Sequence, residues 1–319
     1  MDKRVIRADI LLGLTACIWG FAFTAQRAGM AYIGPFTFNS VRFLLGGVLL
    51  VPFILLNNKK TSKTGHKDEK SGRFLIFSMA AAGICLFAAA SLQQAGLVWT
   101  TAGNSGFLTG IYVVIVPVFG IFMGRKTGPQ TWAGALLALA GLFFVIGGVN
   151  LETVNRGDIL TIASGVFWAL HVILIDTFVQ KTDAVKLACG QFIVCGLLSL
   201  AFALANFSAG LDPKFGAELG ALNFHISMLF DAAIPLLYGG VLSVGVAYTL
   251  QVIAQRDAPP AHAAVILCME SVFAAIGGIL LLSEKPGSGI LLGFLLMLAG
   301  MLATQWDVIM KRTLQKQKA

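Results

Sequence analysis

Two ionisable residues, Arg42 and Glu270, lie well inside long apolar stretches of the sequence. If such a stretch crosses a bilayer, a charge at its centre costs about 2.5–3.5 kcal/mol on insertion scales, so the group usually faces a cavity or a partner. For Glu270, two interpretations stay open: a carboxyl that binds an amine or exchanges protons, and a buried structural carboxylic acid. For Arg42, we favour a structural charge held in an ion pair, with a side chain that snorkels outward as the alternative.

Polar side chains also recur at helical spacing, which places them on one face of a helix. Three such faces occur: Ser105, Thr109 and Tyr112; Ser164, Trp168 and His171; and Tyr248, Gln251 and Gln255. An aqueous cavity requires faces of this kind, although hydrogen bonds between helices produce similar ones. His171 is a candidate proton acceptor near neutral pH and also a candidate structural histidine. Gln93 and Gln94 would line the mouth of a cavity or lie at the lipid headgroups.

Motifs for other chemistry are missing from the sequence. It has no GxxxxGK[ST] phosphate loop, no paired-histidine metal motif and no convincing serine triad. Its five cysteines lie in apolar stretches without a CxxC pair. We therefore expect no metal, no cofactor and no enzyme activity. An intramembrane enzyme would need clustered acids or histidines, whereas Glu270, His171 and His262 are the main candidates and lie far apart in sequence.

The elements that must position these residues are membrane-spanning helices. The chain has 319 residues, of which 57% are hydrophobic and 12% charged, against about 25% charged in soluble domains. A span needs ~20 mostly apolar residues. Ten spans are predicted, at residues 10–26, 35–56, 74–92, 104–123, 132–149, 159–179, 187–207, 234–253, 261–282 and 290–306. A short interfacial helix is expected near residues 224–230.

The distribution of basic residues predicts the orientation of these spans. With ten spans, 18 of the 23 Lys and Arg residues fall on the side of the amino terminus, Arg42 lies in a span, and the other side holds Arg27, Arg156, Lys214 and Lys285. This bias is what the positive-inside rule expects when both termini are cytoplasmic. The net charge of +8 is thus explained by topology, and we expect no nucleic-acid partner.

An internal repeat divides the chain in two. Residues 134–141 (GALLALAG) match residues 293–300 (GFLLMLAG) at six of eight positions, with an offset of 159. Asp9-Ile-Leu matches Asp158-Ile-Leu with an offset of 149, which also aligns Trp19 with Trp168. Because each half has five spans, an odd number, the halves have opposite orientations. Inverted repeats around a central site are typical of alternating-access transporters, although a duplicated structural or channel-like bundle would show them too.

At these residues the sequence resembles the EamA-type members of the drug/metabolite transporter superfamily. The resemblance rests on Trp19, on residues 101–114 (TAGNSGFLTGIYVV), on Gly157-Asp-Ile-Leu with Trp168, on Met269-Glu270, and on the glycine-bounded spans at 132–149 and 290–306. It covers residues 9 to about 306. The sequence departs from the family in having Ser271 where Glu-Pro is common, and Arg125-Lys126 where an acidic residue is frequent.

The resemblance implies an all-α membrane carrier with ten helices, in two five-helix repeats at residues 9–149 and 157–308. A central cavity would be lined by spans one, three, four, six, eight and nine. The expected function is export of amino acids or related amines across the inner membrane, by a monomer or homodimer. Substrate contacts are expected from Trp19, Gln94, Ser105, Thr109, Tyr112, Trp168, His171, Tyr248, Gln251 and Glu270, with coupling at Glu270 and His171.

Overall fold

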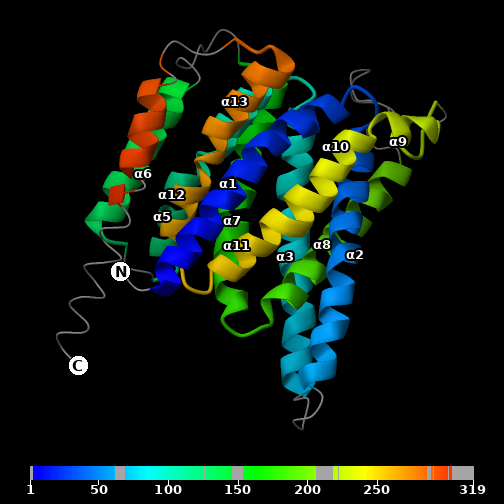
Figure 1. The fold of residues 1–319 in the computed structure, drawn as a ribbon, viewed down its shortest axis with the longest axis horizontal. Coiled ribbons are helices and arrows are strands. Elements are labelled where there is room, and N and C mark those ends of the chain that lie inside the picture. The colour runs from blue at the N-terminus through cyan, green and yellow to red at the C-terminus, as the bar shows by residue number, and fades with distance from the viewer. Residues whose placement is uncertain are drawn as a thin grey trace.

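The structure is a computed structural model that describes residues 3–61, 69–124, 127–145, 154–205, 218–221, 223–285, 289, 291–300 and 302–303. These residues form a bundle of helices without strands (Figure 1). In chain order the helices are α1 (Lys3–Gly29), α2 (Pro35–Thr61), α3 (Glu69–Gly96), α4 (Ala102–Thr109), α5 (Tyr112–Phe122), α6 (Pro129–Val145), α7 (Arg156–Val179), α8 (Ala184–Leu204), α9 (Ser227–Asp231), α10 (Ala233–Leu237), η2 (Tyr238–Tyr248), α11 (Thr249–Ala254), α12 (Pro260–Leu267) and α13 (Glu270–Leu282). A further apolar helix covers Leu291–Gly300.

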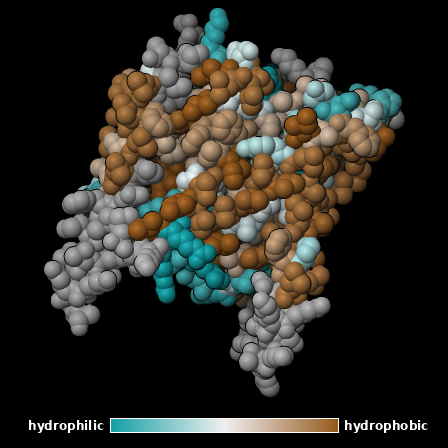
Figure 2. All heavy atoms as spheres, viewed as in Figure 1, coloured by the Kyte–Doolittle hydropathy of each residue, from teal (hydrophilic) through white to brown (hydrophobic). Residues whose placement is uncertain are grey.

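The described residues contain eight helical segments that are long and apolar enough to cross a membrane. Two shorter apolar helices, Pro129–Phe144 and Leu291–Gly300, occupy the places where the fifth and tenth spans are predicted. Large apolar side chains cover the outside, among them Phe122, which is 84% exposed, and Ile234, which is 82% exposed. Hydrophobic residues occupy much of the visible surface in Figure 2, with hydrophilic residues gathered mainly toward its ends. Lipid contact explains this apolar exterior.

Three details differ from the sequence-based prediction. Both α2 and α3 extend beyond the apolar stretch, as far as Thr61 and from Glu69, into the polar segment for which a loop is predicted. The short helix expected near residues 224–230 is present as α9, which has no buried residue, but it covers Ser227–Asp231 and so begins three residues later. Two predicted spans, 104–123 and 261–282, are each broken into two helices.

The breaks in these two spans share one geometry. Between α4 and α5, Ile111 N–H donates to the carbonyl three residues earlier, that of Leu108, and Val113 N–H donates to that of Gly110. Between α12 and α13, Met269 N–H donates to Ile266 and Ser271 N–H to Cys268 in the same way. Such tight turns within a helix redirect the chain and mark functional hinges. We call α4–α5 the first interrupted helix and α12–α13 the second.

The segment Tyr238–Tyr248 has the wider turns of a π-helix. Glycines allow it to lie close to α2: a β-carbon on Gly240 would be 2.6 Å from Leu45 Cδ2, and a β-carbon on Gly46 would be 2.7 Å from Val244 Cβ. In π-helical turns, hydrogen bonds link residues five apart, so different side chains share a face than in an α-helix. This segment therefore presents residues to the interior that α-helical spacing would not align.

The two halves of the chain pack with approximate twofold symmetry. A β-carbon on Gly141 would lie 2.6 Å from the carbonyl oxygen of Gly293, and one on Gly300 would lie 2.6 Å from that of Gly134. Adding the offset of 159 residues to Gly134 and Gly141 gives Gly293 and Gly300, so the two contacts are equivalent. They show that α6 and the helix Leu291–Gly300 pack in antiparallel fashion. The repeated glycines are thus the points where the equivalent helices of the two halves touch.

Other contacts between the halves follow the same symmetry. The helix α1 packs against the second interrupted helix, and its equivalent α7 packs against the first. Likewise α1 lies along η2 while α7 lies along α3. The helices α2 and α8 pack on each other in antiparallel fashion, with Gly47 near Ile193 and Leu44 near Gly196. The bundle therefore has an interior shared by both halves.

Candidate functional site: a central cavity between the two halves

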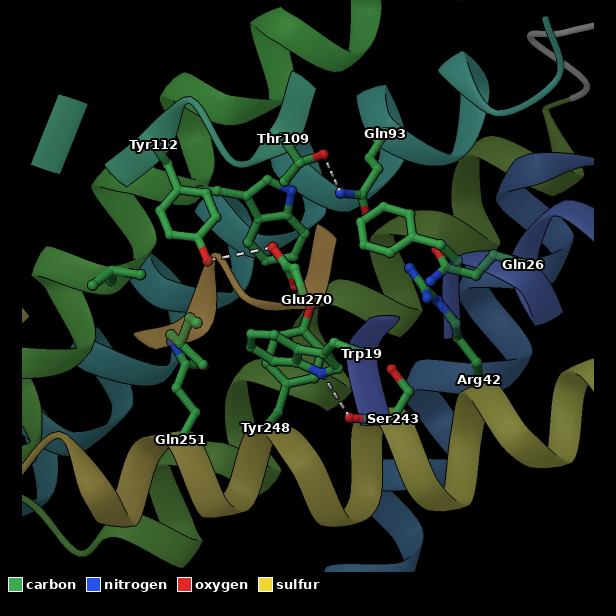
Figure 3. Close-up of a pocket in the computed structure, with 14 residues that line it drawn as sticks. Trp19, Gln26, Arg42, Gln93, Thr109, Tyr112, Ser243, Tyr248, Gln251 and Glu270 are labelled. Carbon is green, nitrogen blue, oxygen red and sulfur yellow. Dashed lines mark hydrogen bonds between the residues drawn. The ribbon is translucent and has the colours of Figure 1, made fainter. Parts of the chain in front are cut away.

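A cavity lies in this shared interior, and the empty space between its lining residues, including the part open to solvent, is about 450 Å³. Fourteen residues line it (Figure 3): Trp19, Phe23, Gln26, Arg42, Gln93, Thr109, Tyr112, Trp168, Val172, Ser243, Tyr248, Gln251, Leu267 and Glu270. They come from both halves of the chain. The six predicted spans all contribute, and α2 adds Arg42, which the family resemblance did not include.

The two interrupted helices meet at the cavity. Glu270 is the first residue of α13 and is 4% exposed, and Tyr112 is the first residue of α5 and is 3% exposed. The Tyr112 hydroxyl donates a hydrogen bond of 3.3 Å to Glu270 Oε1 (Figure 3). Close by, the Ser271 hydroxyl donates to the Gly106 carbonyl at 2.6 Å. The breaks thus hold the carboxyl of Glu270 at the junction of the two halves.

Aromatic rings form one wall of the cavity. The Tyr248 ring contacts those of two tryptophans, with centroid distances of 4.4 Å to Trp19 and 6.0 Å to Trp168. Trp19 Nε1 donates to the Ser243 carbonyl at 3.2 Å, whereas Trp168 Nε1 is buried without a hydrogen-bond partner in the described part of the chain. The two tryptophans aligned by the repeat therefore line one cavity and contact the same tyrosine.

Amide side chains line another part of the cavity. Gln93 Nε2 donates to the Thr109 hydroxyl at 2.9 Å, which joins α3 to the first interrupted helix. Gln26 Oε1 is buried and has no hydrogen-bond partner among the described residues. An acceptor without a partner in a dry interior is costly, and a substrate in the cavity can supply the missing donor.

Arg42 is the one cationic residue among those lining the cavity. Its side chain is 2% exposed, so it does not snorkel to the surface. The ion pair expected for it does not occur in the parts of the chain that the structure describes, and its Nε is buried without a partner. Its guanidinium carbon lies 4.8 Å from the ring centroid of Phe43 and 5.7 Å from that of Phe38.

The structure brings together seven of the ten residues expected to contact substrate. Those lining the cavity are Trp19, Thr109, Tyr112, Trp168, Tyr248, Gln251 and Glu270. The other three are buried elsewhere. Gln94 Nε2 contacts the Gln26 carbonyl at 3.4 Å, and the Ser105 hydroxyl is buried without a partner among the described residues.

His171, expected in a coupling role, lies behind the aromatic wall. Its ring centroid is 5.9 Å from that of Trp168 and 6.3 Å from that of Tyr248, and its Nε2 is 2.8 Å from Gln191 Oε1. It is fully buried and does not line the cavity. Gln255 is also outside the cavity, because its Nε2 donates to the Val172 carbonyl at 2.9 Å. Helical spacing predicts which face of its helix each residue lies on. It does not predict which residues of neighbouring helices pack against that face.

Five lining residues were not identified from sequence: Phe23, Gln26, Val172, Ser243 and Leu267. Phe23 and Gln26 follow Trp19 at i+4 and i+7 on α1, a spacing that could have indicated them. Val172 follows Trp168 at i+4 in the same way. Ser243 lies five residues before Tyr248, and only the π-helical turns bring these two to one face.

Equivalent contacts close the bundle at its two ends. At the end where α1 begins, His262 Nε2 lies 2.7 Å from Asp9 Oδ1. At the opposite end, the Thr100 hydroxyl donates to Asp158 Oδ1 at 2.6 Å. Asp9 and Asp158 correspond under the repeat, and each contacts a residue at or near the start of the interrupted helix of the other half. The cavity thus lies between two end contacts of similar construction.

Comparisons with known proteins agree with this architecture. The model of the EamA-like transporter family matches the chain twice, over residues 6–147 and 155–305. Two uncharacterized transporters of Archaeoglobus fulgidus are similar: one is 29% identical over 87% of this chain and 79% of its own length, the other 27% identical over 93% and 97%. The uncharacterized inner membrane transporter YedA of Escherichia coli is 31% identical over 48% of this chain and 47% of its own length.

A solved structure has the same fold. A crystal structure of a protein superimposes with a TM-score of 0.69 at 16% identity, covering 96% of this chain and 98% of its own. The apolar helices and these relatives show that the chain is a multi-pass membrane protein. With a family model that matches both halves over almost the whole chain, the protein belongs to the EamA-like transporter family.

Proposed function

We propose that the protein is a secondary transporter that exports small metabolites, such as amino acids or related amines, by alternating access. The observation that carries this proposal is the cavity at the junction of the two interrupted helices, one from each half. Interrupted helices at the interface of inverted repeats are the usual binding sites of secondary transporters. Export and the choice of amines rest on the family resemblance and on the carboxyl of Glu270.

In this proposal, ten helices cross the inner membrane and both termini are cytoplasmic. The antiparallel packing of equivalent helices and the excess of basic residues on one side support it. Positions 66 and 210, which lie outside the described residues, test the orientation. In intact cells, an impermeant thiol reagent should label Gly210→Cys and leave His66→Cys unlabelled. The reverse pattern would refute the orientation.

We assign the coupling step to Glu270. Its carboxyl lies in the cavity with one hydrogen bond from Tyr112, so a substrate amine can compete for the same oxygens. Occupation by a proton and occupation by an amine would then exclude each other. His171, which lies behind Trp168, would act on this exchange only through the aromatic wall.

The test is transport by the purified full chain in proteoliposomes. A panel of amino acids and amines is measured with and without a proton gradient, first as net uptake and then as counterflow against a preloaded substrate. A carrier gives saturable flux and accelerated exchange. Flux that neither saturates nor shows counterflow would indicate a channel, and chemical conversion of the added compound would indicate an enzyme. Either result would contradict the proposal.

A further inference from the structure

Arg42 is a buried cation for which the protein supplies no anion among the described residues. It is 2% exposed, and its Nε has no hydrogen-bond partner there. No ion pair with Arg42 occurs within the described ranges. Glu270 also lines the cavity, but its carboxyl accepts from Tyr112 and does not reach the guanidinium (Figure 3). The cavity therefore holds one cation and one carboxyl that do not neutralise each other directly.

The aromatic contacts of Arg42 do not replace an anion. The faces of Phe38 and Phe43 attract the guanidinium, but cation–π contacts are weak compared with the cost of removing a full charge from water. An arginine also cannot escape this cost by losing its proton. Buried arginines in proteins are accordingly paired with an acid or an anionic ligand. The Arg42 side chain lines the cavity, so an anion in the cavity can reach its guanidinium.

The shape of the guanidinium specifies the kind of anion. Its planar set of N–H donors matches a carboxylate, which it can bind through two parallel hydrogen bonds. The cavity surface near Arg42 is neutral, with Gln26 and Ser243 beside it (Figure 3). Glu270 is the one acidic residue among those that line the cavity, and it does not pair with Arg42. The guanidinium therefore stays available to an incoming carboxylate.

We infer that Arg42 is an anion-binding subsite of the cavity, which receives a carboxylate of the transported molecule while Glu270 lies against a different part of it. The inference rests on the proposed transport function and specifies it: cargo with a carboxylate is bound in preference to its neutral analogue. The role expected from sequence, a charge held in a structural ion pair, is thereby replaced by a ligand-binding role.

Direct binding of a small carboxylate to the purified full chain tests this subsite without requiring transport. Phenylacetate and its neutral analogue phenylacetamide are titrated separately, and binding is followed by the shift in thermal unfolding midpoint and by tryptophan fluorescence. We expect phenylacetate to half-saturate the protein at a concentration roughly tenfold or more below that of phenylacetamide, because hydrogen bonds to a charged group are the stronger ones. A parallel titration with chloride separates carboxylate binding from general anion binding.

Variants assign the effect to Arg42. In Arg42→Gln the preference for phenylacetate should fall to about twofold or less, while Arg42→Lys should keep part of it because the charge remains without the planar donors. Arg27→Gln is the matched control, since Arg27 bonds to the carbonyls of Leu97 and Val98 and does not line the cavity. It should keep the full preference.

Several outcomes would overturn the inference. These are equal binding of the two compounds by the wild type, a preference that persists in Arg42→Gln, or chloride binding as tight as that of phenylacetate. A structural role also predicts that ligand-free Arg42→Gln unfolds at a lower temperature, whereas relief of an unpaired buried charge predicts an equal or higher midpoint. Carboxylate binding combined with absent flux in proteoliposomes would refute the transport proposal and leave the anion subsite standing.

Discussion

The two interrupted helices have the same construction and different chemistry. In both, hydrogen bonds to the residue three positions earlier break the helix near its middle, at Gly110–Ile111 and at Cys268–Met269. An offset of 158 residues relates the two breaks, one less than the offset of 159 that relates the glycines of α6 and the helix Leu291–Gly300. The first carries neutral groups, the hydroxyls of Thr109 and Tyr112, and the second carries the carboxyl of Glu270. Duplication thus explains the geometry of the cavity but not its charge.

The other buried charge of the cavity, Arg42, belongs to the first half of the chain, whereas Glu270 belongs to the second. At the offset of 149 that aligns Trp19 with Trp168, Arg42 on α2 corresponds to Gln191 on α8. Gln191 is fully buried and bonds to His171, outside the cavity. Glu270, the first residue of α13, corresponds to Tyr112, the first residue of α5. Each half therefore contributes one charge that its counterpart lacks, the first half a cation and the second an acid.

This comparison separates residues that build the cavity from residues that select what enters it. Symmetric positions, such as the glycines that join equivalent helices, should affect folding in equal measure in both halves. Asymmetric positions should affect binding and coupling. Substitutions at the two kinds of position should therefore have different effects.

Glu270→Gln should reduce proton-driven accumulation in proteoliposomes to a tenth or less of the wild-type level, an effect on the order of 1.4 kcal/mol or more. The amide keeps the size of the side chain and can accept from Tyr112, but it cannot bind a proton. Exchange of substrate against substrate should survive at saturating substrate, because it requires no net proton movement, although loss of the carboxylate weakens the binding of an amine. Measuring both fluxes in the same vesicles separates loss of coupling from loss of folding.

Glu284→Gln is the matched control for this change. Glu284 is also an acid of the second half, but its carboxyl accepts from the backbone N–H groups of Ala102 and Gly103 at the start of α4. Its replacement should lower stability by about 0.5–2 kcal/mol through loss of this cap, and leave proton dependence intact. A Glu270→Gln protein that is well folded and keeps wild-type proton dependence would refute the coupling role.

Alanine at Gly141 and alanine at Gly300 should each destabilise the protein by about 1–3 kcal/mol. In both cases the new methyl group would meet a carbonyl oxygen of the partner helix at 2.6 Å. Gly13→Ala is the control, because a β-carbon there has no neighbour within 4 Å. Thermal unfolding in detergent measures all three, and clearly unequal losses at Gly141 and Gly300 would contradict the symmetric packing.

Much of this fold could be predicted from sequence because hydropathy and glycine spacing are local signals. The matching segments 134–141 and 293–300 carry the glycines at which the equivalent helices touch, so the repeat in the sequence coincides with a contact in space. The breaks at Gly110 and Met269 were not predicted. A tight turn in an apolar helix depends on the packing around it, here including the bond from Ser271 to the Gly106 carbonyl.

The candidate site was predictable in part, for similar reasons. Glu270 was recognised because an acid inside an apolar span is costly, and Trp19 and Trp168 because the internal repeat aligns them. Ser243 was missed because α-helical spacing turns residues five apart by ~140° from each other, whereas the π-helical segment brings Ser243 and Tyr248 together. His171 was placed in the cavity because sequence cannot show that Gln191 covers it from another helix.

Loss of either end contact should make the cavity more accessible from the end at which that contact lies. Thr100→Ala removes the hydrogen bond to Asp158 at one end, and His262→Gln weakens the contact with Asp9 at the other. A hydrogen bond contributes about 1 kcal/mol net, which corresponds to roughly a fivefold change in the ratio of two conformations.

A cysteine at position 26, in the cavity, reports this change. In a background without Cys17, which is partly exposed, labelling of Gln26→Cys by an impermeant reagent is measured from each side of the membrane. Thr100→Ala should favour labelling from the end at which Thr100 lies, and His262→Gln from the other. Equal shifts in the same direction for both variants would exclude opposed end contacts.

The smallest predicted difference concerns the two aligned tryptophans. In Trp19→Phe, the Ser243 carbonyl loses its donor, so this variant should lose about 0.5–1.5 kcal/mol from the missing hydrogen bond. In Trp168→Phe, the removed N–H has no partner among the described residues, and burying an unpaired donor is itself unfavourable. Both changes remove similar ring volume from the wall beside Tyr248, so the cavity terms largely cancel in the comparison. Trp168→Phe should therefore unfold at the higher temperature of the two, and a Trp168→Phe protein less stable than Trp19→Phe would show that the Trp168 N–H is bonded in the membrane.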